Sequence, residues 1–126
     1  ALSDPRPVRS VGADARVDSR HVVITCIDFA ESVGRVPSVS ELCAIAHVSE
    51  RRLRSAFRDE FDVPPTRFFG AWALCEAHRR LAHHDAAAQT VTKVATDLGF
   101  DHLGRFSGHY RDIFDECPSA TLRHVN

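Results

Sequence analysis

The feature that most constrains the fold of this chain is an internal repeat of apolar and capping residues. Four residues recur at a displacement of 53 positions, namely Leu53 as Phe106, Phe57 as Tyr110, Phe61 as Phe114 and Pro65 as Pro118. Five residues further upstream recur at a displacement of 52 positions, from Val39, Leu42, Cys43, Val48 and Ser49 to Val91, Val94, Ala95, Phe100 and Asp101. The second copy is therefore expected to have one extra residue after its cap. Because apolar positions, capping residues and prolines all agree, the sequence predicts two copies of one supersecondary unit.

Each copy has the signals of a short helix followed by a longer one. In the first copy, Ser38 and Glu41 have the spacing of a capping box, which predicts the start of the short helix. Ser49 predicts the start of the longer helix, which ends at two prolines because proline cannot continue a helix. The apolar stripe expected on this longer helix consists of Leu53, Ala56, Phe57 and Phe61.

The second copy repeats these signals with different residues. Thr90 is the expected cap of its short helix, and Asp101 is the expected cap of its longer helix. Gly99 fits the turn between them, where a left-handed backbone conformation is often needed. His47 stands at the corresponding turn of the first copy and is one of the non-glycine residues enriched in that conformation. Short helix, tight turn and longer helix together predict a helix-turn-helix in each copy.

The remaining segments predict how the two copies are connected. Residues 1–18 mix prolines, charges and small residues without periodicity, which indicates a linker or an extended arm. A helix is expected after Ser19, with Gly34 just past its end. The fold class expected is all-α with about seven helices. It comprises a first helix-turn-helix subdomain (residues 19–64), a long linking helix (65–84) and a second subdomain (85–126), with a loop near residues 84–90 and a last short helix or turn from Pro118.

The composition narrows the class of protein. A chain of 126 residues with 44% hydrophobic and 26% charged residues is typical of one compact domain or of two small ones sharing a core. The most apolar run, residues 21–30, is too short to cross a bilayer, and no signal segment precedes it. The sequence therefore predicts a cytoplasmic protein without a membrane partner.

Cysteine and histidine spacing gives no sign of a metal or a cofactor. Cys26, Cys43, Cys75 and Cys117 lie far apart and form no C-x-x-C pair, so reduced and mostly buried thiols are expected. The eight histidines include no H-x-x-x-H, and the nearest clusters are His83 with His84 and His102 with His109. Neither a glycine-rich phosphate loop nor a nucleophile elbow is found. No metal, no cofactor and no enzymatic activity are expected.

Two segments carry a family resemblance. These are "SELCAIAHVSERRLRSAFRDEFDVPPTRFF" and "VTKVATDLGFDHLGRFSGHYRDIFDECPS", of which the second follows the pattern I-A-x-x-x-G-F…F-x-x-x-F-K…F-G-x-x-P. From about Ser38 to Leu122 the chain resembles the DNA-binding region of the AraC/XylS transcription regulators. The resemblance implies two recognition helices presented to successive major-groove segments of double-stranded DNA. It also implies an activator or repressor whose effector-binding or dimerisation domain is expected to be absent from this chain.

The longer helix of the first copy is the expected main reader of bases. The net charge is −1 and the pI about 6.8, so any basic surface has to be local. A rotation of about 100° per residue places Arg51, Ser55 and Arg58 opposite the apolar stripe, with Arg52 and Arg54 beside them. The resemblance aligns Arg51, Arg54 and Ser55 with base-reading positions. Ser49, Arg52 and Arg58 are expected to contact phosphates.

The longer helix of the second copy departs from the family pattern. Arg105 and Ser107 are its expected base-reading residues, and Arg111 is its expected phosphate contact. Gly104 and Gly108 each cost about 1 kcal/mol relative to alanine in a helix interior. Either these glycines permit close approach of the backbone to DNA, or the second unit reads sequence poorly and the first unit dominates.

Two partner classes follow from this interpretation. Double-stranded DNA is the expected partner of a sequence-specific regulator, and RNA polymerase is a second candidate. The alternative is a helical protein-interaction module that docks RNA polymerase or a partner regulator, which the near-neutral net charge favours.

Overall fold

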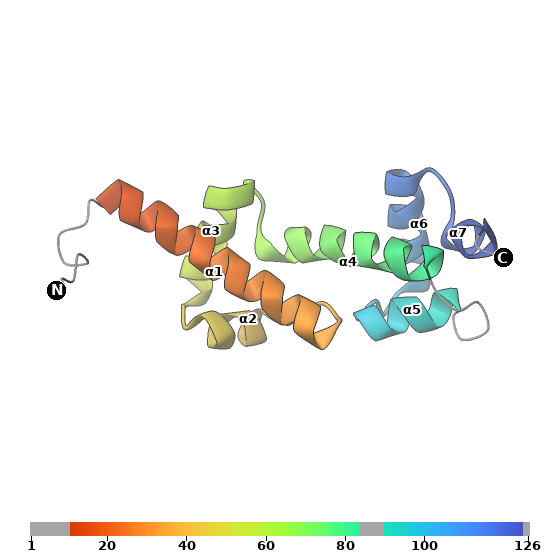
Figure 1. The fold of residues 1–126 in the computed structure, drawn as a ribbon, viewed down its shortest axis with the longest axis horizontal. Coiled ribbons are helices and arrows are strands. Elements are labelled where there is room, and N and C mark those ends of the chain that lie inside the picture. Colours follow the sequence, from red (N-terminus) through yellow and green to blue (C-terminus); the bar gives the residue numbers. More distant parts are fainter. Residues whose placement is uncertain (1–10, 84–89, 125–126) are drawn as a thin grey trace. The chain divides into compact units, whose positions relative to one another are not determined.

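The computed structural model describes residues 11–83 and 90–124, with side chains described for residues 19–83 and 90–123. Within these ranges the chain consists of helices joined by short turns, without a strand (Figure 1). The all-α class and the expected seven helices are thereby confirmed. In chain order the helices are α1 (Val11–Val33), α2 (Val39–Ala46), α3 (Glu50–Phe61), α4 (Pro65–Ala82), α5 (Val91–Leu98), α6 (Leu103–Phe114) and α7 (Pro118–His124).

The helices belong to two compact units. The first unit comprises Ala1–Ser32 with Pro37–Phe68, and the second comprises Val33–Val36 with Phe69–Asn126. Helix α4 contributes to both units, since its first turn lies in the first unit and the rest in the second; the expected bounds of the linking helix and of the two subdomains stay predictions. The loop expected near residues 84–90 falls mostly on residues 84–89, which lie outside the described residues.

The short segment between α1 and α2 belongs to the second unit, which the sequence did not predict. The backbone N–H of Val36 donates to the carbonyl of Leu98 at 2.9 Å, at the end of α5. The Arg80 guanidinium on α4 donates to the carbonyl of Gly34, also at 2.9 Å. Gly34 has φ 73° directly after the last residue of α1, so the expected helix end at this glycine is confirmed.

Helix α1 begins earlier than the sequence indicated. Its first residue is Val11, so the expectation of an extended arm over residues 1–18 was wrong for residues 11–18. The physical reason is that no proline occurs after Pro7 until Pro37, and only Gly12 disfavours a helix before Ser19. The expected arm over residues 1–10 lies outside the described residues.

The core of the first unit is formed by the apolar faces of α1, α2 and α3. Its fully buried aliphatic and aromatic side chains include Leu42, Leu53 and Phe57. Phe61 was expected to belong to the same stripe, but its side chain is 43% exposed. As the last residue of α3, Phe61 has no further helical turn beside it. It stacks on Phe68 of α4, with the ring centroids 4.6 Å apart.

The core of the second unit surrounds a buried tyrosine. The Tyr110 hydroxyl donates to the Thr121 hydroxyl at 2.7 Å, and Thr121 in turn donates to the Glu116 carboxylate. His78 Nδ1 lies 3.0 Å from the Tyr110 oxygen, which makes Nδ1 the donor because the tyrosine proton already points at Thr121. Burial raises the pKa of Tyr110, so its hydroxyl stays protonated and can donate. The His78 ring also stacks on Phe114 at 4.2 Å.

The four cysteines are free, but the expectation that most of them are buried was wrong. Only Cys26 is fully buried, and burial raises the pKa of its thiol to about 11. Cys75 is exposed because it lies off the buried stripe of α4, while Cys43 and Cys117 are partly exposed. A hydrogen bond with Ser119 lowers the pKa of Cys117. Among the described helices, none has the length and apolar composition that a bilayer span requires.

The buried tyrosine network gives a test of the second unit's core. Tyr110→Phe is expected to lower the free energy of unfolding by about 1–3 kcal/mol, because Thr121 and His78 each lose a buried partner. Urea unfolding followed by circular dichroism measures this change. Thr121→Val completes a double-mutant cycle. The double variant should lose less stability than the sum of the two single losses, because both changes remove the same Tyr110–Thr121 hydrogen bond. Additive losses would show that the two groups do not interact.

Candidate nucleic-acid interface

A left-handed residue closes the turn between α2 and α3. Helix α2 starts with the expected capping box, in which Ser38 accepts from the Glu41 N–H and the Glu41 carboxylate accepts from the Ser38 N–H. It ends at His47, which has φ 57° and ψ 45°, so the expected special conformation of this histidine is confirmed. Two residues later Ser49 caps α3 by accepting from the Arg52 N–H at 3.1 Å. This short turn makes α2 and α3 a helix-turn-helix (Figure 1).

The outward face of α3 carries a row of three arginines. Arg51, Arg54 and Arg58 are all exposed and occupy positions i, i+3 and i+7, which place them on one side of the helix. We call these three residues the arginine row. The opposite side is anchored by Leu53 and Phe57, which have no exposed surface. Three fixed positive charges therefore lie together on one helix face, although the net charge of the chain is −1.

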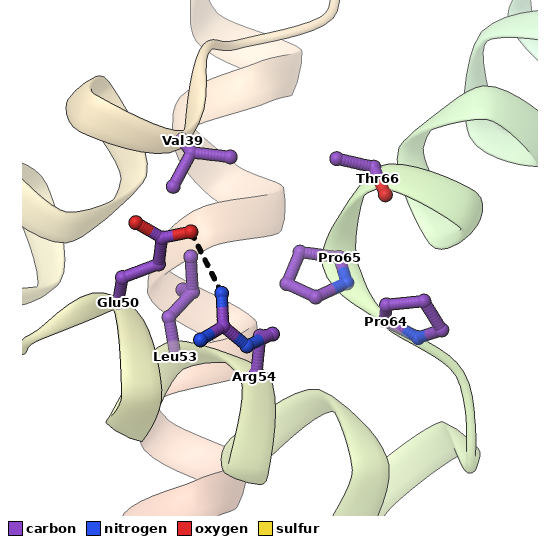
Figure 2. Close-up of a pocket in the computed structure, with 7 residues that line it drawn as sticks. All are labelled: Val39, Glu50, Leu53, Arg54, Pro64, Pro65 and Thr66. Atoms are coloured by element: carbon purple, nitrogen blue, oxygen red, sulfur yellow. Dashed lines mark hydrogen bonds and ion pairs between the residues drawn. The ribbon is translucent and has the colours of Figure 1, made fainter.

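Within the arginine row, Arg54 lies against an acidic partner. Its Nη1 is 2.7 Å from Glu50 Oε2, one turn earlier on α3 (Figure 2). Both side chains are about half exposed, so this ion pair is weak and is easily exchanged for another anion. The pair lies beside a small pocket of about 100 Å³, lined by Val39, Glu50, Leu53, Arg54, Pro64, Pro65 and Thr66.

Two of the expected DNA contacts lie instead on the side of α3 that faces α1. Arg52 is partly buried, and its Nη1 donates to the hydroxyls of Ser19 at 3.2 Å and Ser55 at 2.9 Å. Ser55 is itself partly buried. The base-reading role predicted for Ser55 and the phosphate contact predicted for Arg52 therefore stay predictions, and both side chains are engaged within the protein.

The second unit repeats the geometry of the first with one difference in the turn. Thr90 caps α5, and Gly99 ends it with φ 104°, as expected. The cap of α6 is His102, whose Nδ1 accepts from the Arg105 N–H at 3.2 Å, so the prediction that Asp101 caps this helix was wrong. Asp101 and His102 both have side chains that can accept a hydrogen bond, and the longer turn places His102 at the start of the helix. The extra residue thus lies before the cap rather than after it.

Helix α6 presents a less basic surface than α3. Phe106 and Tyr110 are buried, while Arg105 and Arg111 are exposed and Ser107 is partly buried. With the displacement of 53 positions, the arginine row corresponds to Gly104, Ser107 and Arg111. Only one of the three cations is retained. The predicted contacts of Arg105, Ser107 and Arg111 remain predictions.

Packing within the protein does not require glycine at either of the two glycine positions of α6. A Cβ added at Gly108 would meet no atom within 4 Å, and one at Gly104 would approach the His102 ring at an ordinary 3.5 Å. Neither has a positive φ, unlike Gly99. Alanine would therefore fit at both positions within the protein.

The chemistry available on α3 is the binding of anions and of hydrogen-bond acceptors. Guanidinium groups suit phosphate oxygens and can bind the O6 and N7 atoms of guanine through two hydrogen bonds. In the described parts of the chain, no group of three or more metal-ligating side chains comes together. Sequence reasoning missed Ser19 and Asp59, which contact each other beside Arg52, because no local pattern relates residues 40 positions apart.

Comparison with known proteins places these features in a family. A family model of the helix-turn-helix domain matches residues 42–124. A Rhodococcus erythropolis protein described as a probable thc operon regulatory protein is 31% identical over 105 residues, which cover 82% of this chain and 32% of that protein. The XylDLEGF operon transcriptional activator 1 of Pseudomonas putida is 36% identical over 93 residues, or 74% of this chain and 28% of that protein.

A solved structure agrees with the sequence comparisons. A Rhodopseudomonas palustris protein described as a probable AraC family transcriptional regulator has a TM-score of 0.70 and 32% sequence identity, covering 84% of this chain and 98% of that one. The chain spans about a third of the length of these two curated relatives.

The open space at Gly108 leads to a stability prediction. Gly108→Ala is expected to raise the free energy of unfolding by about 1 kcal/mol, because alanine favours the helix and meets no clash. Chemical denaturation measures the gain. Gly99→Ala is the matched control and should destabilise by about 1 kcal/mol, since φ 104° strains any residue with a Cβ. A loss of stability in Gly108→Ala would mean that the glycine is needed for the fold.

Proposed function

This chain belongs to the AraC/XylS family of helix-turn-helix transcription regulators, and we propose that it recognises specific double-stranded DNA mainly through α3. The observation that carries the proposal is the arginine row on an exposed helix that begins directly after a left-handed turn. Recognition helices of this kind contact base edges near their N-terminal ends. Arg51 and Arg54 lie nearest that end.

The proposed roles of the arginines on α3 follow the exposure of their side chains. Arg51 and Arg54 read bases, and Arg58 binds a phosphate one turn further along the helix. The Ser49 backbone at the start of α3 is a further proposed phosphate contact, since helix N-termini favour anions. In α6, Arg105 and Ser107 contact bases and Arg111 contacts a phosphate. With fewer cations, α6 supplies less of the affinity.

Membership of the family establishes the class of activity, transcription regulation, but it does not decide between activation and repression. Its members are transcription regulators rather than enzymes. We propose that this chain acts in the cytoplasm on DNA, with its two recognition helices in successive major-groove segments, and that contact with RNA polymerase follows if it activates transcription. An effector-binding or dimerisation domain is proposed to lie outside this chain. The alternative of a pure protein-interaction module is not favoured by the exposed arginine row.

Salt dependence tests the proposed function directly. Sequences selected from a random DNA pool should bind with an affinity that falls at least about tenfold between about 50 and about 200 mM salt, because each phosphate contact releases counterions. Fluorescence anisotropy with a labelled duplex measures the affinity. Affinity that does not change with salt, or a pool that yields no preferred sequence, would contradict the proposal.

The base-reading role of Arg51 has its own test. Arg51→Ala is expected to weaken binding to the selected sequence by about 1–3 kcal/mol and to relax the preference at one base pair. Arg79→Ala is the matched control: Arg79 is exposed on α4, outside both recognition helices, and its loss changes the net charge equally. If both variants lose the same affinity for all sequences, Arg51 contributes charge alone.

A further inference from the structure

A polar cluster joins α1 to the side of α3 that does not carry the arginine row. Ser19 on α1 has no exposed surface. Its hydroxyl donates to Asp59 Oδ2 at 2.7 Å and accepts from Arg52 Nη1 at 3.2 Å. Arg52 Nη1 also donates to Ser55 at 2.9 Å. We call Ser19, Arg52, Ser55 and Asp59 the α1–α3 cluster.

The cluster has a fixed geometric relation to the arginine row. Its members on α3 are residues 52, 55 and 59, at positions i, i+3 and i+7. The arginine row has the same spacing at residues 51, 54 and 58. Each cluster residue on α3 therefore follows one arginine of the arginine row by one position. One position corresponds to a rotation of about 100° around the helix. Any rotation of α3 against α1 turns the arginine row by the same angle.

Directional hydrogen bonds add to the restraint that the buried Leu53 and Phe57 place on this rotation. The two N–H groups of Arg52 Nη1 are each used by one serine hydroxyl. A buried hydroxyl has to keep its hydrogen bonds, because losing them leaves polar groups desolvated without a partner. Another polar contact between α1 and α3 joins Arg20 and Glu60 at 3.7 Å, and the Arg20 side chain is 74% exposed, so this ion pair adds little.

We propose that Ser19 and Arg52 are positioning residues of the DNA interface, which set the rotation of α3 and so the direction in which Arg51, Arg54 and Arg58 point. The proposal rests on the proposed function of α3 as a DNA-reading helix. It gives Arg52 a role within the protein instead of the phosphate contact expected from the sequence. Helix α1 is thereby part of the recognition machinery although it carries none of the base-reading side chains.

A double-mutant cycle on DNA binding tests the proposal. Ser19→Ala, Arg52→Gln and the double variant are compared with the parent on a selected duplex and on an unrelated duplex. Ser19→Ala is expected to weaken binding to the selected duplex about three- to tenfold, with binding to the unrelated duplex and the salt slope unchanged, because it removes no charge and its hydroxyl is buried. In the Arg52→Gln background it should have no further effect.

Controls separate positioning from a general loss of folding. Ser32→Ala removes an exposed serine of the same helix and should bind as the parent does. Unfolding curves of every variant fix a temperature at which all of them are folded, and binding is measured there. A purely structural role would lower the unfolding midpoint without changing the ratio between selected and unrelated duplex.

Besides an unchanged ratio between selected and unrelated duplex, two results would overturn the proposal. One is Ser19→Ala binding the selected duplex as the parent does. The other is Arg52→Gln weakening both duplexes equally and reducing the salt slope by about one, which is the signature of a phosphate contact. Failure of the proposed function is distinguishable, since the parent protein itself would then show no salt-dependent binding to any duplex.

Discussion

The left-handed residue in each tight turn is the constraint on which the arrangement of both helix pairs depends. His47 ends α2 with φ 57°, and Gly99 ends α5 with φ 104°. Each redirects the chain after a helix of eight residues, so that the following longer helix buries Leu53 and Phe57 in one unit and Phe106 and Tyr110 in the other. Glycine adopts this conformation freely, whereas histidine does so at a cost that the surrounding helices have to offset.

Helix α3 combines three environments around one axis. Its apolar side anchors it in the core, the α1–α3 cluster holds one flank, and the arginine row occupies the exposed flank. The ion pair between Arg54 and Glu50 is weak because both groups are half exposed. A rigidly held helix with exchangeable surface partners is suited to a ligand that has many anionic groups in a regular array.

The two units have the same order of helices and turns, but their longer helices expose different residues. Both longer helices end at an aspartate in the left-handed conformation, Asp62 and Asp115, and these two residues show the same 53-residue displacement as the repeat. Where α3 has Arg51 and Arg54, α6 has Gly104 and Ser107. The two units therefore agree at buried apolar positions and differ at exposed ones, because folding depends mainly on the buried side chains.

Local signals predicted most of the helices and placed Arg51 and Arg58 on the outward face of α3, but they also placed Ser55 there, and Ser55 is partly buried. Ser38 with Glu41, Ser49, Thr90 and the two turn residues act through neighbours within a few positions, so α2, α3 and α5 could be placed from the sequence. The sequence could not decide whether Asp101 or His102 caps α6, because both side chains carry a hydrogen-bond acceptor. Only the length of the turn decides which of the two stands at the start of the helix.

The sequence by itself determined the duplicated helix-turn-helix and the concentration of arginines on one helix, because caps, periodicity and turn residues are short-range properties. Only the tertiary structure decided which of those arginines are exposed. It turned Arg52 toward Ser19 on α1, left Phe61 partly uncovered and joined Val33–Val36 to the second unit. These outcomes depend on contacts between residues distant in the chain, and no local pattern records which distant side chains will meet.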